Sequence, residues 1–119
     1  MKTTEIPRKN KIVLRSGKLY NMIESDVIIP SNERVTIQGL VTGDVDVESH
    51  AILELNGMVL GMIRVGEGGK AIINGMVMKS VEEYDGDVKI SGRVIGDVIQ
   101  HKGNVVYDKT AIVGKRITK

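Results

Sequence analysis

The 119-residue sequence contains no Phe, no Trp and no Cys, and only three Tyr, although 41% of its residues are apolar. Compact globular cores take much of their buried area from aromatic side chains. A core built from Val, Ile, Leu, Met and Ala instead suits a narrow interior of thin, repeated layers. The absence of Cys excludes disulfides and thiolate metal ligands, and we expect a protein of the reducing cytoplasm.

Long hydrophobic runs are also missing. No apolar segment approaches the roughly 18 residues that span a bilayer, and residues 1–18 lack the apolar segment of a signal peptide. The net charge is only +2, but residues 1–18 and 102–119 are basic and the chain between them is acidic. Basic ends indicate either an anionic partner, such as a membrane surface or a nucleic acid, or solvated tails.

One short pattern of alternating glycine and aliphatic residues returns along the chain. It reads "GLVTGDV" from Gly39, "GMVLGMI" from Gly57 and "GRVIGDV" from Gly92. Around each copy apolar residues alternate with polar residues, which is the period of a β-strand and not of a helix. The copies follow one another with a period of 18, shortened once to 17, when Gly75 is counted between Gly57 and Gly92. A fixed period of this length predicts a parallel β-solenoid in which each coil stacks on the previous one.

A shorter period of six residues lies within the period of 18. Its members are Val35, Val41, Val47, Leu53, Val59, Val65, Ala71 and Val77. Because 18 is three times six, we expect about six triangular coils with three short faces and with these side chains pointing inward. Gly39 and Gly43 then lie near the corners, where the interior narrows or where the chain bends with positive φ.

The residues after the inward aliphatics bear on the handedness of the coil. Left-handed β-helices with a hexapeptide period, many of which are acyltransferases, usually carry a small or acidic residue there, often glycine. In this chain Thr42, Glu48, Glu54 and Leu60 hold these positions, and the glycines fall two residues away from the aliphatics. The motif fits the left-handed type poorly and favours a right-handed coil.

The stretches "VTIQGLVTGDVDVESHAILELNG" and "VKISGRVIGDV" resemble the bactofilins, and the resemblance covers residues 26–113. Bactofilins are bacterial cytoskeletal proteins, short right-handed β-helices with brief disordered tails, which assemble into filaments without nucleotide. The resemblance implies a non-enzymatic scaffold whose subunits join end to end through their terminal coils. In some relatives a short N-terminal segment also contacts the membrane, so the same contact is an expectation for the basic N-terminal tail here.

The expected organisation is a basic, flexible N-terminal tail over residues 1–16, a solenoid over 17–113 and a basic C-terminal tail over 114–119. A solenoid exposes unpaired strands and an apolar cross-section at each end unless the end is capped, and no capping helix is predicted. Open ends that match each other generate linear polymers. The residues predicted to form the end-to-end interface are Leu19, Ile23, Val105, Tyr107 and Ile112.

Two features favour an alternative, a relative that has lost polymerisation. Lys79 and Glu83 break the alternation of the third coil, and "EEYDGD" at residues 82–87 is expected to bulge out as a loop. Lys115, Arg116 and Lys119 are expected to guard the far end of the solenoid against stacking.

No set of residues predicts catalysis, so we expect no enzyme activity, no cofactor and no metal. His50 and His101 are expected to be surface residues near corners. The stretch "GEGGK" at residues 66–70 lacks the strand–loop–helix setting of a phosphate-binding loop and predicts a corner of the solenoid. Nucleic-acid binding is not expected, because the basic residues are not interleaved with stacking aromatics.

The carboxylates at outward positions are expected to form a solvated acidic face. They are Asp44, Asp46, Glu48, Asp87 and Asp97. Asp44 and Asp97 are equivalent in the repeat, but Met62 and Ser80 lie between them, so the continuous ladder of a calcium-binding repeat is absent.

A group of outward apolar residues predicts a surface for other proteins. The residues of this stripe are Leu40, Met58, Leu60, Met62, Met76 and Met78. Met is common at adaptable protein-binding surfaces, and the alternative is that the tails fold back and cover the stripe. The stripe supports a second function, a non-polymeric binding module such as an inhibitor or immunity protein.

Overall fold

The computed structural model describes residues 2–8 and 11–119, and all regular structure within them is β-strand, arranged in three sheets. Sheet A contains β3 (Gly17–Leu19), β6 (Arg34–Ile37), β9 (Ile52–Leu55), β12 (Lys70–Ile73), β15 (Asp87–Ile90) and β18 (Asn104–Tyr107). Sheet B contains β1 (Glu5–Arg8), β2 (Lys11–Leu14), β5 (Asp26–Ile29), β8 (Val45–Val47), β11 (Ile63–Val65), β14 (Val81–Glu83), β17 (Val98–Gln100) and β20 (Arg116–Thr118). Sheet C contains β4 (Met22–Ile23), β7 (Leu40–Val41), β10 (Met58–Val59), β13 (Met76–Val77), β16 (Arg93–Val94) and β19 (Ile112–Val113).

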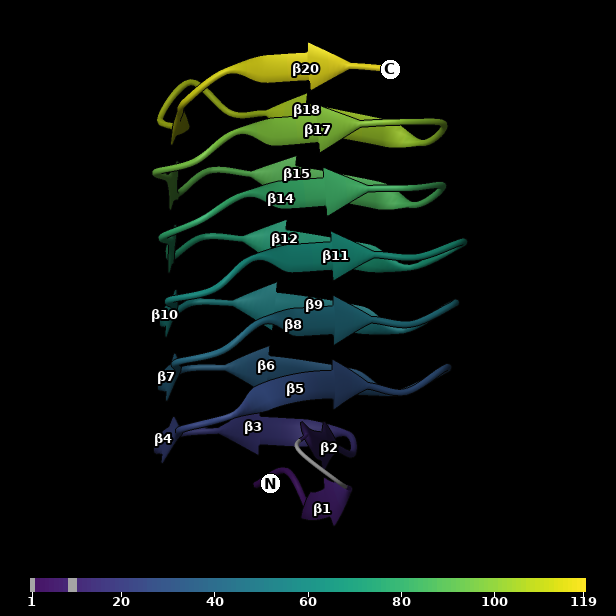
Figure 1. Ribbon diagram of the computed structural model, residues 1–119, viewed down its shortest axis with the longest axis vertical. Helices are drawn as coiled ribbons and strands as arrows, with labels where there is room; N and C mark the ends of the chain where they lie inside the picture. The colour runs from purple at the N-terminus through teal and green to yellow at the C-terminus, as the bar shows by residue number, and fades with distance from the viewer. Residues whose placement is uncertain (1, 9–10) are drawn as a thin grey trace.

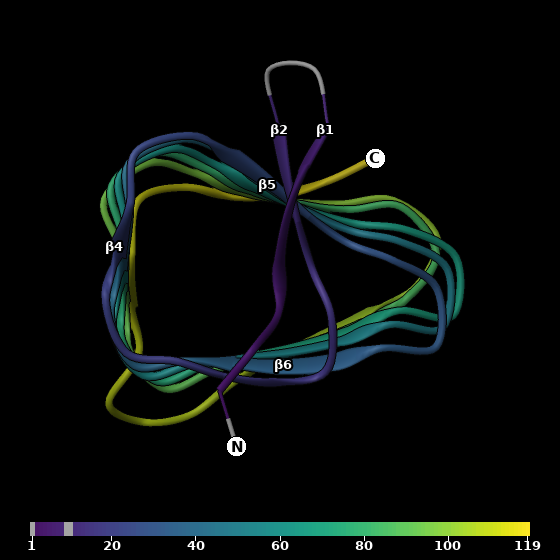
Figure 2. The ribbon, with the colours of Figure 1, turned by 90° about the horizontal axis from the view of Figure 1, so that it is seen from below.

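The strands follow one another around a coil in the order sheet A, sheet C, sheet B, as in β6–β7–β8. Over most of the chain, neighbours in a sheet are parallel and one repeat apart, so that Val35 pairs with Leu53 and Leu53 with Ala71. The coils stack along the long axis (Figure 1), and seen from the N-terminal end the chain runs clockwise as it recedes (Figure 2). The predicted right-handed parallel β-solenoid of about six coils with three faces is therefore confirmed.

The interior consists of inward side chains stacked in columns along the axis. All members of the six-residue period from Val35 to Val77 are buried, as predicted. In β6 and β9 every second residue is buried, because successive side chains of a strand point to opposite faces. Among the described residues, every buried side chain is aliphatic or alanine except that of Glu83. Removal of this apolar area from water is the main stabilisation of the fold, at about 25 cal/mol per Å².

The repeated glycines are explained by the close approach of successive coils. A Cβ atom added to Gly57 would overlap the backbone carbonyl oxygen of Gly39, and one added to Gly75 would overlap the carbonyl of Gly57. The expected positive φ is wrong for Gly39 and Gly43, since the positive-φ glycines of the described residues are Gly17 and Gly68. The repeat thus selects glycine because a backbone lies where the side chain would be.

The corner between sheets B and A carries one left-handed residue in each of three successive coils. These are Asn32 (φ 67°), His50 (φ 62°) and Gly68 (φ 69°), each one repeat after the last. Asn, His and Gly are the residue types that adopt this conformation most readily. The "GEGGK" stretch is therefore a corner that runs into β12, as predicted.

The coil that contains Lys79 and Glu83 is intact, which corrects the expected break there. Glu83 belongs to β14, pairs in register with Val65, and is fully buried. Its carboxylate accepts hydrogen bonds from the backbone N–H groups of Gly86 (2.7 Å), His101 (3.1 Å) and Gly103 (2.8 Å). The corner after β14, residues 84–86, is one residue shorter than the corner after β11, residues 66–69, and the corner after β17, residues 101–103, is equally short. The carboxylate compensates for that shortening by holding this corner and the next.

Most of the expected N-terminal tail is folded, so the ordered chain begins before residue 17. β2 joins sheet B parallel to β5, and β1 pairs antiparallel with β2. Val13 and Leu14 are buried, so the apolar residues of "KIVL" extend the core although basic residues surround them. Residues 1, 9 and 10 of the expected tail lie outside the described residues. The C-terminal segment 114–119 is not a tail either, because β20 pairs with β17.

Candidate assembly surfaces

The N-terminal end of the solenoid is closed by its own chain. The segment before β1 crosses the end of the first coil (Figure 2), and Thr3 donates its N–H to the carbonyl of Lys18 (2.9 Å). Leu19 and Ile23, two residues predicted for the end-to-end interface, are consequently only 1% and 4% exposed. They belong to the core in this structure, which corrects their placement at an open end. The outermost strand β1 contains Pro7, which has no N–H to donate to a further strand.

The C-terminal end is open. β18, β19 and β20 are the last strands of sheets A, C and B and have one neighbour each. The inward residues of this coil, Val105, Tyr107, Ala111 and Val113, pack against the core but are only half-buried. Val105 and Tyr107 therefore lie where the sequence predicted an interface.

Ile112 differs from the other predicted interface residues. It pairs in register with Arg93 on the outer face of sheet C, whereas its neighbour Val113 continues the inward column of Val94. Ile112 is 58% exposed, but it faces sideways from the solenoid and not along its axis.

A cation lies at the open end. Arg116 pairs with Val98, at an inward position, and its guanidinium stands 3.8 Å from the centre of the Tyr107 ring. Burial raises the pKa of the Tyr107 hydroxyl, so the ring is neutral at physiological pH and offers a π face to the cation. Of the three C-terminal cations expected to hinder stacking, Arg116 therefore lies in the inward column of the open end.

The outer face of sheet C gathers most of the predicted apolar stripe into two adjacent columns. The first column, in register from coil to coil, is Met22, Leu40, Met58, Met76, Arg93 and Ile112. The second column lies two residues later in each coil and contains Leu60, Met78 and Ile95. Met22, Met78 and Ile95 are 51%, 40% and 46% exposed, and the remaining predicted members are half-buried.

Sequence reasoning missed Met22 and Ile95 and included Met62, which lies in a third column. Steps of 18 back from Leu40 and 17 forward from Met78 would have found the two missing residues. The third column is polar, because the Asp26 carboxylate accepts the N–H of Asp44 (2.8 Å) and that of Asp44 accepts the N–H of Met62 (2.9 Å).

The opposite border of the sheet C face is an amide and hydroxyl ladder. Asn74 donates its side-chain N–H to Asn56 Oδ1 (2.9 Å), and Ser91 donates its hydroxyl to Asn74 Oδ1 (2.8 Å). The two apolar columns are therefore framed by polar side chains that bond to one another.

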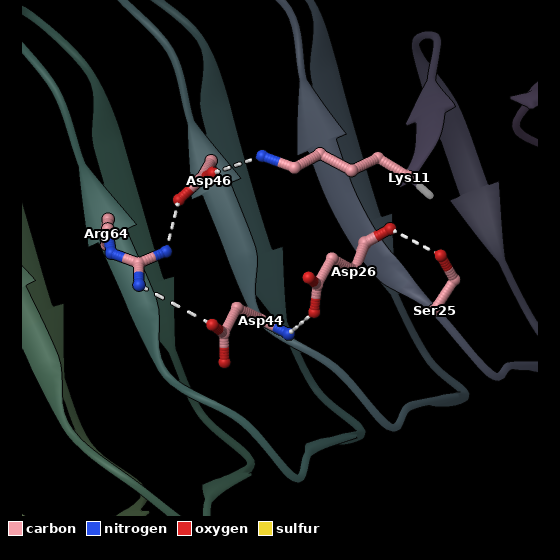
Figure 3. A network of polar contacts seen from close by, with 6 residues as sticks. All are labelled: Lys11, Ser25, Asp26, Asp44, Asp46 and Arg64. Atoms are coloured by element: carbon pink, nitrogen blue, oxygen red, sulfur yellow. Dashed lines mark hydrogen bonds and ion pairs between the residues drawn. The ribbon is translucent and has the colours of Figure 1, made fainter. Parts of the chain in front are cut away.

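The outer face of sheet B is polar and ion-paired (Figure 3). Arg64 contacts Asp46 (3.0 Å) and Asp44 (3.5 Å), and Lys11 lies 3.8 Å from Asp46 on the other side. These pairs are partly exposed, so each adds at most about 1 kcal/mol to stability. The expected solvated acidic face is in fact neutralised over these residues, because basic side chains of other coils reach its carboxylates.

The two histidines lie at corners, as expected. His101 Nε2 lies 2.8 Å from Glu82 Oε2, and its ring stacks on Tyr84 with 5.1 Å between centroids. The hydrogen bond from His101 lowers the pKa of the Glu82 carboxyl, against the opposing effect of burial. His50 is the left-handed corner residue, and its ring lies beneath Gly68.

The fold and these surfaces define an all-β protein, a right-handed parallel β-solenoid with one closed end, one open end and an apolar side face. Comparison of the chain with protein-family models, curated proteins and solved structures finds no match. Over residues 2–8 and 11–119 there is no helix long and apolar enough to cross a membrane. The same residues contain no group of three His, Asp or Glu side chains that could hold a metal ion.

Proposed function

We propose that this protein is a non-enzymatic structural scaffold, similar to the bactofilins, that self-assembles without nucleotide through the end of its solenoid. The observation that carries the proposal is the open C-terminal coil, with three edge strands and a half-buried apolar cross-section. Its expected location is the cytoplasm, with the basic N-terminal segment as the part that would meet an anionic membrane surface.

An open coil end favours association for two reasons. Edge strands present backbone N–H and C=O groups that can pair with another strand. The half-buried Val105, Tyr107 and Val113 also lose contact with water when a second apolar cross-section covers them. A joined end therefore continues both the sheets and the core.

The closed N-terminal end sets a condition on filament growth. With residues 2–8 and β2 in place, Leu19 and Ile23 are covered, so C-terminal joining alone gives a pair of subunits. Growth into a filament requires the N-terminal segment to leave the end of the first coil or to take part in the contact.

The test is negative-stain electron microscopy of the purified protein at low and high salt, with two variants. Val105→Asp places a charge in the inward column of the open end and is expected to abolish end-to-end assembly. The matched control is Val106→Asp, because Val106 is the adjacent residue but faces outward and is 58% exposed. End-to-end assembly into filaments that survives Val105→Asp, or a strictly monomeric wild-type protein in all conditions, would refute the proposal.

A second candidate function is a non-polymeric binding module, such as an inhibitor or immunity protein, that presents the apolar columns of sheet C to one partner. The exposure of Met22, Met78 and Ile95 favours it, since a contiguous apolar patch with a polar rim is typical of an interaction site. The double change Met58→Asp and Met76→Asp is expected to retain the circular dichroism of the fold and to remove the interaction. Unfolding would show that these side chains belong to the core.

A further inference from the structure

The apolar columns of sheet C form a flat side face with a regular spacing. Each coil contributes one row of two side chains, for example Met58 with Leu60 and Met76 with Met78. Rows of successive coils are about 4.8 Å apart, as in any sheet. The ladders of Asn56 with Asn74 and of Asp26 with Asp44 border the face, so its edges are marked on both sides.

Two opposite charges lie within these columns, near the two ends of the face. Glu24 follows Met22 and Ile23 of β4 and occupies the second column in the first coil. Arg93 pairs with Met76 and occupies the first column in the fifth coil. Both side chains are exposed, and neither makes an ion pair within the described chain. They are equidistant, by two coils each, from the row of Met58 and Leu60.

We propose that the occupant of this face is a second copy of the chain, packed antiparallel about a two-fold axis that passes through the row of Met58 and Leu60. The axis runs along the strands of sheet C. A partner with the same coil spacing keeps the five rows from Met22 to Arg93 in contact, which a surface of different periodicity cannot do, and leaves the sixth row, that of Ile112, beyond the interface. Each copy then places its Arg93 beside Glu24 of the other, so the interface contains this ion pair twice.

The positions of Glu24 and Arg93 favour the antiparallel pair over the other two-fold arrangement of two copies. A parallel pair, related by an axis along the solenoid, would bring the two Arg93 side chains together and the two Glu24 side chains together. In the antiparallel register the row of Leu40 and Thr42 faces the row of Met76 and Met78, and the third row faces itself. Apart from Thr42, the side chains that meet in the three central rows are apolar, and opposite charges meet in the rows on either side.

This interface is independent of the proposed end-to-end assembly, because sheet C faces sideways and the open end faces along the axis (Figures 1 and 2). A chain with the Val105→Asp change removes end joining and leaves the side face intact. The two associations can therefore fail separately.

The first experiment is sedimentation equilibrium of the full chain with Val105→Asp, which is expected to give a concentration-dependent dimer. Adding Met78→Asp is expected to abolish that dimer. Adding Ile72→Asp instead is expected to leave it unchanged, since Ile72 is an outward apolar residue of the same coil on sheet A. Arg93→Glu and Glu24→Arg are each expected to weaken the dimer about tenfold, and the two together to restore it to within about threefold.

A second experiment needs no change to the open end. The chain has no Cys, so Met58→Cys places a single thiol beside the two-fold axis. Facing sheets pack about 10 Å apart, and a bis-maleimide of about that span is expected to link two copies in high yield. Ile72→Cys is expected to remain unlinked. In the sedimentation experiment, a monomer at every concentration or no rescue by the combined charge swap would overturn the proposal. In the linking experiment, equal linking at Met58→Cys and Ile72→Cys would overturn it. The proposal would also fail if sheet C bound a different protein and never a second copy of the chain.

Discussion

Replacing Gly57 with alanine is expected to destabilise the solenoid strongly. The added Cβ would overlap the carbonyl oxygen of Gly39, the acceptor for the N–H of Met58 at 3.0 Å. The contact lies between two backbones, so no side-chain rotation can relieve it. The two coils must move apart by more than about 1 Å, beyond hydrogen-bonding distance at this position.

The expected loss of unfolding free energy has two parts, the overpacking of the interior and the lost backbone hydrogen bond. Overpacking of a tight interior costs about 1–3 kcal/mol, and the loss of the Met58 bond together with strain on its neighbour adds about 1–2 kcal/mol. The free energy of unfolding should fall by roughly 2–5 kcal/mol. With about 2.1 cal/mol/K of unfolding entropy per residue over 119 residues, the melting temperature should fall by about 8–20 °C.

Thermal unfolding followed by circular dichroism measures this shift, and Gly66→Ala is the matched control. A Cβ added to Gly66 meets its nearest atom, the carbonyl oxygen of Val47, at 3.3 Å. That clash is small, and alanine also reduces the entropy of the unfolded chain, so the melting temperature should change by less than about 4 °C. Equal melting temperatures for the two variants would refute close coil packing as the reason for the repeated glycine.

Further predictions concern the buried and bridging carboxylates. Glu83→Val should lower the free energy of unfolding by about 2–5 kcal/mol in denaturant titrations, because the N–H groups of Gly86 and Gly103 lose their acceptor. This loss is expected although valine fits the column, where the paired residue of the previous coil is Val65. Unchanged stability would contradict the prediction. The pKa of Glu33 is lowered by its hydrogen bonds from Ser16 and Arg15, and that of Glu82 by its bond from His101. Such carboxyls stabilise the fold above their ordinary pKa of 4.5 and lose this contribution as the pH falls through the lowered values. The double change Glu33→Gln and Glu82→Gln should therefore reduce the loss of melting temperature between pH 6 and pH 3, and an equal loss in both proteins would rule out the linkage.

The interior of the solenoid could be predicted because it depends on local periodicity. Val41, Val59 and Val77 recur at equivalent positions, and alternation assigns each to the inner face. A one-residue error would turn every apolar side chain outward, so the pattern fixes the register strongly. The glycines were located correctly for the same reason, although the physical cause was the backbone of the neighbouring coil and not positive φ.

The ends and the corners could not be predicted in this way. Leu19 and Ile23 carry the signature of inward residues, but whether they are exposed depends on where residues 2–8 lie. That segment is short, basic and outside the repeat, so nothing in its periodicity indicates that it crosses the first coil. A charged residue at the inward position of Glu83 predicts a break in the apolar alternation. The sequence does not show that backbone N–H groups of the shortened corner point at its carboxylate.

The sequence by itself determined a parallel β-solenoid with an aliphatic interior, because a strand period within a longer fixed repeat has few other ways to bury one face. It favoured a right-handed coil, and the path of the chain in the tertiary structure decided the hand. Only the tertiary structure decided that the N-terminal end is closed and the C-terminal end open, since closure depends on contacts between segments far apart along the coil. It also decided which outward residues are neighbours, because Met22, Leu40, Met58 and Met76 are each a full repeat apart in sequence yet adjacent on sheet C.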